Sequence, residues 1–440
     1  MLDMKWMQEH QEVQAEIQRV ADQKGIKLSV AELMELDDQR RMLLQTVEGL
    51  RQQRNAFTQE ISGFIRMNKP AEAEVTKQQV QHINAQLNEL EAELRGLENE
   101  YNQRLILVPN IVSPDTPPGT SDQDNVEIRR VGEPPVFAFE QKDHVQLGEL
   151  HRLMDIPRGV RTAGTRSYYL TGIGAWLHRA VQQLAVDMLV AKGFTLMDVP
   201  LTVRTEAMEN TAFFPLGQDQ AFRLAEEDKW LAGTSEVPLV SYYSGEIVEV
   251  TTPIRMAAAS LCFRSEVGSG GRDVHGLYRV HQFAKVEQVI VCEGDQDTSE
   301  RLLQEITWNA EELLQKLELP YRVVAVCVGD MSQKTYKQYD IETWMPSRNA
   351  YGETHSSSNL LDFQARRSNI RYRDAEGKLR YCHTLNNTAV ASPRILIPLL
   401  ENHQLADGSI HIPVALRPYM NGLERIQAPG DAAETADHAE

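Results

Sequence analysis

Two long stretches near the start of the chain carry apolar residues at alternating spacings of four and three. They cover residues 36–64 and 80–101. A hydrophobic period sustained near 3.5 residues is typical of helices that pack as a coiled coil. Because Lys69-Pro70 lies between them, the pattern predicts a turn and two helices folded back as a hairpin over about residues 36–105. At 1.5 Å per residue the hairpin would extend roughly 40–60 Å.

After the hairpin the pattern changes twice. A segment rich in Pro, Asp and Ser follows first, which predicts a linker. Helical stretches, such as the one around residues 174–192, then alternate with short β-branched runs, and this mixture is typical of an α+β domain with an antiparallel sheet flanked by helices. Strands are expected near residues 260–266, 279–291 and 322–328. The acidic, low-complexity end of the chain predicts disorder. The predicted division is a helical arm, a linker, a core domain and a tail, at residues 1–107, 108–135, 136–425 and 426–440.

The composition fits an ordinary globular protein of the cytoplasm. Of the 440 residues 42% are apolar and 25% are charged, as in typical soluble domains. No apolar run reaches the length of about 18 residues that a membrane helix needs, and the N-terminus lacks the character of a signal or transit peptide. The four cysteines lie far apart without a C-x-x-C pair, which argues against a disulfide framework and a cysteine zinc site. We therefore expect a cytoplasmic protein without a membrane partner.

The net charge of −18 argues against a nucleic-acid binder, because bulk charge of this sign repels a phosphate backbone. Any contact with RNA must depend on local basic residues. Such residues gather on the first predicted helix of the hairpin, whereas glutamates predominate on the second. The hairpin could grip an RNA backbone through this basic stripe. Periodicity alone is equally compatible with a coiled coil that joins two subunits.

The segment Cys262–Glu287, CFRSEVGSGGRDVHGLYRVHQFAKVE, contains the groups that activate a nucleotide without a Walker loop. The guanidinium of Arg264 could clamp an α-phosphate through two parallel hydrogen bonds. The ring of Phe283 could stack on a purine, and Glu287 could bind a substrate ammonium. No Rossmann or P-loop fingerprint follows any predicted strand, which argues against those nucleotide-binding folds.

This segment closely resembles motif 2 of the seryl-tRNA synthetases. Asn386-Asn387-Thr388 followed by Arg394 is similar to their motif 3, and DFQARRSNIRYR and IPVALRPYMNG also match the family. The resemblance extends to about residue 425. It implies a class II synthetase fold, with an antiparallel sheet flanked by helices and an N-terminal antiparallel coiled-coil arm that reaches the variable arm of the tRNA.

The resemblance also implies the reaction and its participants. Serine and Mg·ATP would form seryl-adenylate, and serine would then pass to the 3′ end of tRNA(Ser), and also of tRNA(Sec). Positioning and charge stabilisation would carry both steps, so no side chain need act as nucleophile. The family also implies a homodimer, with motif 1, the helix ending before Pro200, at the subunit interface.

Individual roles follow from the same resemblance. Arg264 and Arg394 are expected to be catalytic, and Glu353 and Ser356 offer hard oxygen ligands to Mg²⁺. The residues expected to bind serine are Thr234, Ser235, Glu236, Arg264, Glu287, Asn386 and Thr388. Those expected to bind ATP are Arg264, Ser265, Glu266, Arg279, Val280, Phe283, Glu353, Thr354, His355, Ser356 and Arg394. Those expected to contact tRNA are Arg272 and His275 in the motif 2 loop and Arg40, Arg51 and Arg54 on the arm.

Two local conformations follow from the residue types. If Thr234-Ser235-Glu236 is extended, its first and third side chains share one face. Ser392 could cap a helix that has Pro393 at its first position, which would place Arg394 in the first turn.

Several positions depart from the family pattern. Val274-His275 stands where bacterial members have Thr-Arg, and GDMSQKTY (residues 329–336) replaces a segment that usually begins GDLGF. Three alternatives therefore stay open: an antibiotic-linked or inhibitor-resistant paralogue, a ligase that charges a carrier protein, and an inactive tRNA-binding homologue. The retained arm argues against the carrier-protein ligase. The retention of Arg264, Glu287, Glu353 and Arg394 argues against the inactive homologue.

Overall fold

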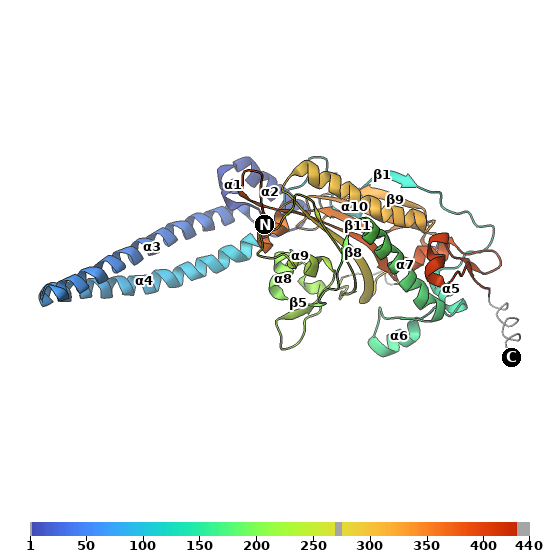
Figure 1. Cartoon of the computed structure of the whole chain (residues 1–440), viewed down its shortest axis with the longest axis horizontal. Helices are drawn as coiled ribbons and strands as arrows, with labels where there is room; N and C mark the ends of the chain where they lie inside the picture. Colours follow the sequence, from blue (N-terminus) through green and yellow to red (C-terminus); the bar gives the residue numbers. More distant parts are fainter. Residues whose placement is uncertain (1, 269–274, 429–440) are drawn as a thin grey trace. The chain divides into compact units, whose positions relative to one another are not determined.

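The computed structural model describes residues 2–268 and 275–428, and these divide into two compact units, Leu2–Pro109 and the chain from Asn110 onward. The first unit is entirely helical. Two long helices form a hairpin, and two short helices precede them (Figure 1). The four helices are α1 (Met4–Glu9), α2 (Gln11–Gln23), α3 (Val30–Arg66) and α4 (Pro70–Leu105).

The pairing of α3 with α4 confirms the predicted coiled-coil hairpin. Pro70 occupies the first turn of α4, where no backbone N–H needs an intrahelical partner. Apolar side chains from both helices form a buried seam that includes Val47, Ile83, Leu87 and Leu94. With 37 residues in α3, the hairpin is about 55 Å long. Local periodicity and one proline are therefore sufficient to specify this unit.

The second unit is built on one large sheet, in the strand order β1-β9-β10-β11-β14-β8-β7-β4. All neighbours are antiparallel except β4 and β7. This arrangement confirms the predicted class II fold with an antiparallel sheet. The strands are β1 (Val126–Val131), β4 (Thr195–Leu196), β7 (Ile254–Phe263), β8 (Gln282–Cys292), β9 (Tyr321–Ala325), β10 (Lys337–Met345), β11 (Ala350–Asn359) and β14 (His383–Ser392).

Helices cover both faces of the sheet and divide its side chains into two layers. On one face α7 (Gly172–Ala191), α10 (Gln296–Lys316) and α12 (Leu396–Asn402) enclose the main apolar core (Figure 1). The other face packs against α9 (Glu236–Ser241) and α11 (Phe363–Ser368). Because side chains of a strand alternate between faces, the odd-numbered residues of β8 point away from α7 and α10. This second face carries the site described below.

The remaining elements are short and lie around the sheet. No helix among the described residues is long and apolar enough to span a membrane. The short elements are α5 (His144–Leu150), α6 (Ile156–Ala163), α8 (Thr205–Asn210), β2 (Met154–Asp155), β3 (Tyr169–Leu170), β5 (Thr202–Arg204), β6 (Lys229–Leu231), β12 (Arg371–Arg373), β13 (Leu379–Tyr381), β15 (Ile410–His411) and β16 (Arg425–Ile426).

The predicted helix start at Ser392 is wrong. Ser392 is the last residue of β14 and lies opposite Ala284 of β8, so its backbone belongs to the sheet. Pro393 has no N–H to continue the ladder, and the chain turns there before α12 begins at Leu396. Arg394 therefore lies in the turn between strand and helix.

Candidate active site

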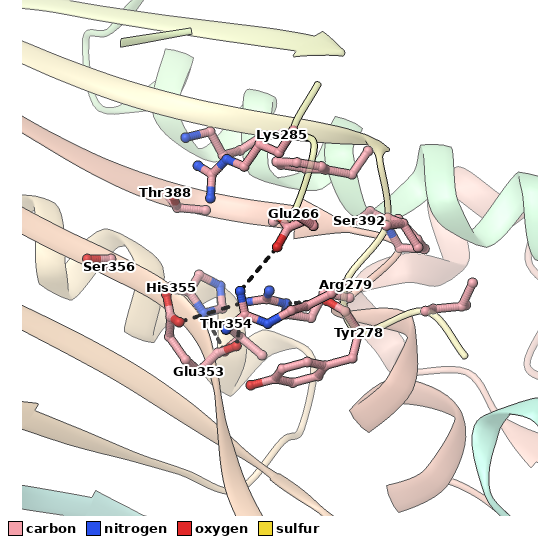
Figure 2. A pocket seen from close by; sticks show the side chains of 17 residues that line it. Glu266, Tyr278, Arg279, Lys285, Glu353, Thr354, His355, Ser356, Thr388 and Ser392 are labelled. Atoms are coloured by element: carbon pink, nitrogen blue, oxygen red, sulfur yellow. Dashed lines mark hydrogen bonds and ion pairs between the residues drawn. The ribbon is translucent and has the colours of Figure 1, made fainter. Parts of the chain in front are cut away.

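A cavity of about 250 Å³ opens on the second face of the sheet, where β8, β11 and β14 lie side by side (Figure 2). Most residues that the sequence assigned to ATP contribute to its walls. The predicted residues that line it are Arg264, Glu266, Arg279, Val280, Phe283, Glu353, Thr354, His355, Ser356, Thr388 and Arg394. The structure thus brings together motif 2, motif 3 and the strand between them, which are far apart in the sequence.

Arg264 lies just beyond the end of β7, against the ring of Phe283. Its guanidinium carbon is 5.4 Å from the centre of that ring, and its Nε donates to the carbonyl of Gly233 at 3.2 Å. Among the described residues, neither Nη nitrogen has a hydrogen-bond acceptor. A planar guanidinium held in this way can present two parallel donors to a phosphate or a carboxylate.

Arg394 enters the same cavity from the turn after β14. Its Nε donates to the carbonyl of Tyr278 at 2.9 Å, and one Nη donates to the carbonyl of Glu353 at 3.1 Å. Its guanidinium also lies 4.4 Å from the centre of the Tyr278 ring. These contacts hold a second positive charge at the cavity wall, where a polyphosphate would be stabilised.

Glu266 and Arg279 pair across the opening of the motif 2 loop. One Nη of Arg279 lies 3.2 Å from Oε2 of Glu266, and the Glu266 side chain is 8% exposed (Figure 2). Glu266 has a backbone φ of +51°, a left-handed conformation that is uncommon outside glycine. The pair supplies both a carboxylate and a guanidinium to the cavity that the Phe283 ring also lines.

A β-bulge explains why four consecutive residues of β11 reach the cavity. The pairing of β10 with β11 shifts between Ile341 and Glu342, so that Thr354 has no partner in the register. A bulge interrupts the alternation of side chains and re-aims those beside it. As a result, Glu353, Thr354, His355 and Ser356 all line the cavity.

His355 lies in a buried part of β11. It is 1% exposed, and its Nδ1 lies 2.8 Å from the hydroxyl of Thr354. Burial lowers the pKa of His355 to about 3, so the imidazole is neutral at physiological pH. It can offer hydrogen bonding to a nucleotide but no positive charge.

A buried ion pair lies on β8, where its lysine, Lys285, lines the cavity. Lys285 Nζ lies 2.6 Å from Oε2 of Glu287 and donates to the hydroxyl of Thr234 at 2.7 Å. Thr388 of β14 donates to the same carboxylate at 3.3 Å. Burial raises the pKa of Glu287, and the neighbouring Lys285 opposes that shift. Glu287, which was expected to bind the serine ammonium, and Thr234, which was expected to bind serine, are thus already joined by an ammonium of the protein.

A second buried ion pair lies on α9. Both carboxylate oxygens of Glu236 are 2.6 Å from Nζ of Lys334. Its Oε1 also accepts from Gln364 at 2.7 Å and from Asn386 at 2.8 Å. Thr234 and Glu236 are not extended as expected, because Ser235 between them is in the αR region at the start of α9. The backbone N–H of Glu236 instead donates to the Thr234 hydroxyl at 3.2 Å.

Several residues expected to bind serine or ATP do not line the cavity, namely Thr234, Ser235, Glu236, Ser265, Glu287 and Asn386. Two of them, Ser235 and Ser265, have partners outside the two ion pairs. The hydroxyl of Ser235 lies 2.5 Å from that of Ser260, and the hydroxyl of Ser265 donates to the carbonyl of Asp219 at 2.6 Å. Both side chains support neighbouring segments.

The residues expected to contact tRNA differ in whether the protein itself already supplies a partner for their side chains. Arg272 lies outside the described residues, as does the tail from residue 429. His275 Nε2 lies 3.1 Å from Oδ2 of Asp143. On the arm, Arg40 pairs with the buried Asp37 and stacks on Tyr101, whereas Arg51 pairs with Glu91 of α4. The remaining residue, Arg54, bonds the side chain of Asn55 at 3.2 Å.

Sequence reasoning missed both lysines of the buried pairs, and it missed Tyr278. A signal for Lys285 was present, because it lies two residues before Glu287 and must share its face of a strand. Lys334 gave no such signal, since 98 positions separate it from Glu236. Only the tertiary structure reveals that pair.

The donor set near Glu353 fits a magnesium ion that arrives with a polyphosphate. No group of three or more His, Cys, Asp or Glu side chains in the described ranges could hold a metal by itself. Mg²⁺ bound through a nucleotide needs only one or two protein carboxylates besides phosphate and water. Glu353 is half exposed. The pKa of the nearby Asp340 is raised well above its usual range, first because Asp340 is buried and then because Glu353 carries a negative charge. A cation here would relieve that repulsion.

Comparisons with known proteins agree with this geometry. Residues 1–112 match the seryl-tRNA synthetase N-terminal domain, and residues 222–403 match the class II core domain of tRNA synthetases (G, H, P, S and T). A serine–tRNA ligase of Deinococcus radiodurans is 44% identical over 98% of this chain and 100% of its own length. One of Brucella abortus is 40% identical over 97% of this chain and 99% of its own.

Solved structures show the same likeness. The seryl-tRNA synthetase of Pyrococcus horikoshii, solved with ATP, superposes with a TM-score of 0.87 at 35% identity and covers 97% of this chain and 100% of its own. The cytoplasmic serine–tRNA ligase of Naegleria fowleri, solved with AMP, superposes with a TM-score of 0.81 at 27% identity. That superposition covers 95% of this chain and 96% of the other.

Proposed function

This chain belongs to the seryl-tRNA synthetase family, and from that premise we propose how its cavity activates serine and how its arm binds tRNA. The protein is a class II aminoacyl-tRNA synthetase that joins serine to tRNA at the expense of ATP. The observation that carries the assignment of the site is the convergence of Arg264 and Arg394 on one cavity, with two buried lysine–glutamate pairs beside it.

The first step joins the serine carboxylate to the α-phosphorus of ATP, and pyrophosphate leaves. Negative charge accumulates on the phosphoryl oxygens in the transition state. Arg264 stabilises that charge, because the Phe283 ring and the Gly233 carbonyl hold its guanidinium in place and no reorganisation is needed. Arg394 neutralises the departing phosphates.

In the second step the 3′-terminal ribose hydroxyl of the tRNA attacks the acyl carbonyl of seryl-adenylate, and AMP leaves. No side chain of the cavity needs to form a covalent bond. The rate depends on the positioning of two substrates and on fixed charges. The adenine would lie against Phe283, with Glu266 and Arg279 at its edge.

The serine ammonium would share Glu287 with Lys285. Lys285 Nζ already contacts both Thr234 and Glu287. The position of this nitrogen therefore marks a place where two acceptors surround a positive charge. Thr388, bonded to the same carboxylate, supplies a hydroxyl close to the substrate side chain. A polar site of this kind rejects alanine strongly, because its buried groups would be left unpaired.

Magnesium would enter with ATP and be held by Glu353, with Ser356 beside it. The ion would supply charge neutralisation to the phosphates. Ser356 accepts a hydrogen bond from Gln338 at 3.1 Å, and this bond fixes its hydroxyl toward β10.

The arm would bind the variable arm of tRNA(Ser), and of tRNA(Sec), through its basic residues. Support comes from the partly exposed position of Arg54 on α3 and from the family to which the chain belongs. We further propose that the enzyme acts as a homodimer in the cytoplasm.

The test is ATP–pyrophosphate exchange over a panel of amino acids, with and without tRNA. Exchange should depend on serine and be at least about 100-fold weaker with alanine. If none of the amino acids supports exchange, the protein would be the inactive homologue. Exchange that withstands a non-hydrolysable seryl-adenylate analogue would indicate the inhibitor-resistant paralogue, and preference for another amino acid would refute the assignment.

A further inference from the structure

Lys334 is the only cation that the described part of the structure places on Glu236. The two side chains are 11% and 7% exposed, so the pair is nearly removed from water. A buried carboxylate is tolerated only where a countercharge and hydrogen bonds replace its hydration. Without Lys334, Glu236 would keep only the amides of Gln364 and Asn386, and its charge would be uncompensated.

The backbone of Lys334 is itself held in place. Asn110, which is 1% exposed, donates from Nδ2 to the carbonyl of Lys334 at 3.0 Å and to that of Leu360 at 2.9 Å. Its backbone N–H donates to Gln333 at 2.9 Å. The loop between β9 and β10 therefore presents Lys334 in a defined position.

Glu236 connects Lys334 to β14, the strand that carries motif 3. Asn386, which donates to Glu236, lies opposite Val289 of β8, and Thr388 lies opposite Glu287 in the same regular register. Two residues apart on one strand, Asn386 and Thr388 face the same side. The pair of Lys334 and Glu236 thus holds Asn386 on the face of β14 that also carries Thr388.

The two buried ion pairs also influence each other. The charge of Glu236 raises the pKa of Glu287, and the charge of Lys334 lowers it. Lys334 belongs to the segment GDMSQKTY, where this chain departs from the usual family pattern.

We propose that Lys334 is a positioning residue for the amino-acid substrate, which acts by holding Glu236 and, through it, Asn386. The proposal rests on the function proposed for the cavity. It predicts a defect confined to serine, because none of these three residues lines the part of the cavity assigned to ATP.

Lys334→Met removes the charge and keeps most of the side-chain length. Lys337→Met is the matched control, because Lys337 is 12% exposed and pairs instead with Asp115 and Glu300. Lys334→Arg tests rescue by a retained charge. Steady-state exchange kinetics give KM for serine and for ATP in each variant. Lys334→Met should raise the serine KM at least about tenfold, whereas the ATP KM and the Lys337→Met enzyme should stay within about twofold of wild type.

Glu236→Gln completes a double-mutant cycle. If Lys334 acts through Glu236, its removal should matter much less once that carboxylate is neutral, so the two effects should not multiply. Should Lys334→Met fail to fold, as judged by circular dichroism, Lys334→Gln in the Glu236→Gln background provides the same comparison.

An unchanged serine KM in Lys334→Met, an equal rise in the ATP KM, an equal defect in Lys337→Met, or multiplying effects in the cycle would each overturn the positioning role. Lys334→Arg with near-wild-type serine KM would support it. A wild-type enzyme without serine-dependent exchange would refute the function proposed for the cavity, and the positioning role with it.

Discussion

The arm and the cavity both use ion pairs between basic residues and glutamates, but in opposite environments. On the arm, Arg51 and Glu91 connect α3 to α4 with side chains 47% and 28% exposed. In the cavity, Lys285 and Glu287 are 6% and 2% exposed. Water competes for the first pair and is excluded from the second.

This difference determines what each pair can do. An exposed pair contributes at most about 1 kcal/mol to stability, because solvent screens it and side-chain entropy opposes it. Removing one partner of a buried pair leaves a charge without hydration, which is strongly unfavourable. The exposed pair of Arg51 and Glu91 can therefore be changed with little cost, whereas the buried charges beside the cavity depend on one another.

The largest effect is expected from Arg264→Ala in the cavity. Loss of the guanidinium should reduce serine-dependent exchange by several hundred-fold or more, since a donor to transition-state charge is worth roughly 3–5 kcal/mol. Exchange kinetics on the purified variant provide the measurement, with circular dichroism to verify folding. Wild-type exchange in a folded variant would contradict the catalytic role.

Replacement of residues 36–105 by a short Gly/Ser turn tests the other side of the comparison. Exchange without tRNA should stay close to wild type, because the catalytic unit is contiguous from Asn110 onward. Aminoacylation should fall by about 100-fold or more, as a linked binding site is lost. Sedimentation of the variant gives the control: dissociation into monomers would support the dimerisation coiled coil instead.

Glu287→Gln should give an intermediate effect. It keeps the shape of the side chain but leaves Lys285 without its buried countercharge, and the serine ammonium loses an ionised acceptor. The serine KM should rise by about tenfold or more, with ATP binding still measurable by calorimetry. Loss of ATP binding with serine binding intact would show that the two pockets had been interchanged.

The smallest effect is expected from Glu91→Gln on the arm. Thermal unfolding should change by less than about 1 kcal/mol, because Arg51 can be hydrated when its partner is removed. Serine-dependent exchange should not change. A loss of several kcal/mol would mean that exposed and buried pairs do not differ as described.

Much of the fold was predictable because its signals are local. The seam of α3 and α4 follows a short repeat, and Pro70 marks the start of α4. The residue string from Cys262 to Glu287 identified motif 2. The same string identified Phe283 and Glu287 as candidate ligands for a purine and an ammonium.

The backbone conformation at the cavity could not be predicted from the local sequence. The bulge at Thr354 and the turn at Pro393 depend on how β10, β11 and β14 pair with their neighbours. A helix cap at Ser392 satisfied local preferences, yet the sheet hydrogen bonds of that residue prevailed. Tertiary pairing overrides local propensity where a strand is buried.

The sequence by itself determined the helical arm, the class of the core domain and the identity of the charged residues that meet at the cavity. Only the tertiary structure decided which charges neutralise which. Lys285 reaches Glu287 within one strand, but Lys334 reaches Glu236 across 98 positions, through a loop held by Asn110. The physical reason is that periodicity encodes which face a side chain occupies, whereas the pairing of buried charges depends on which distant segments the fold brings within hydrogen-bonding distance.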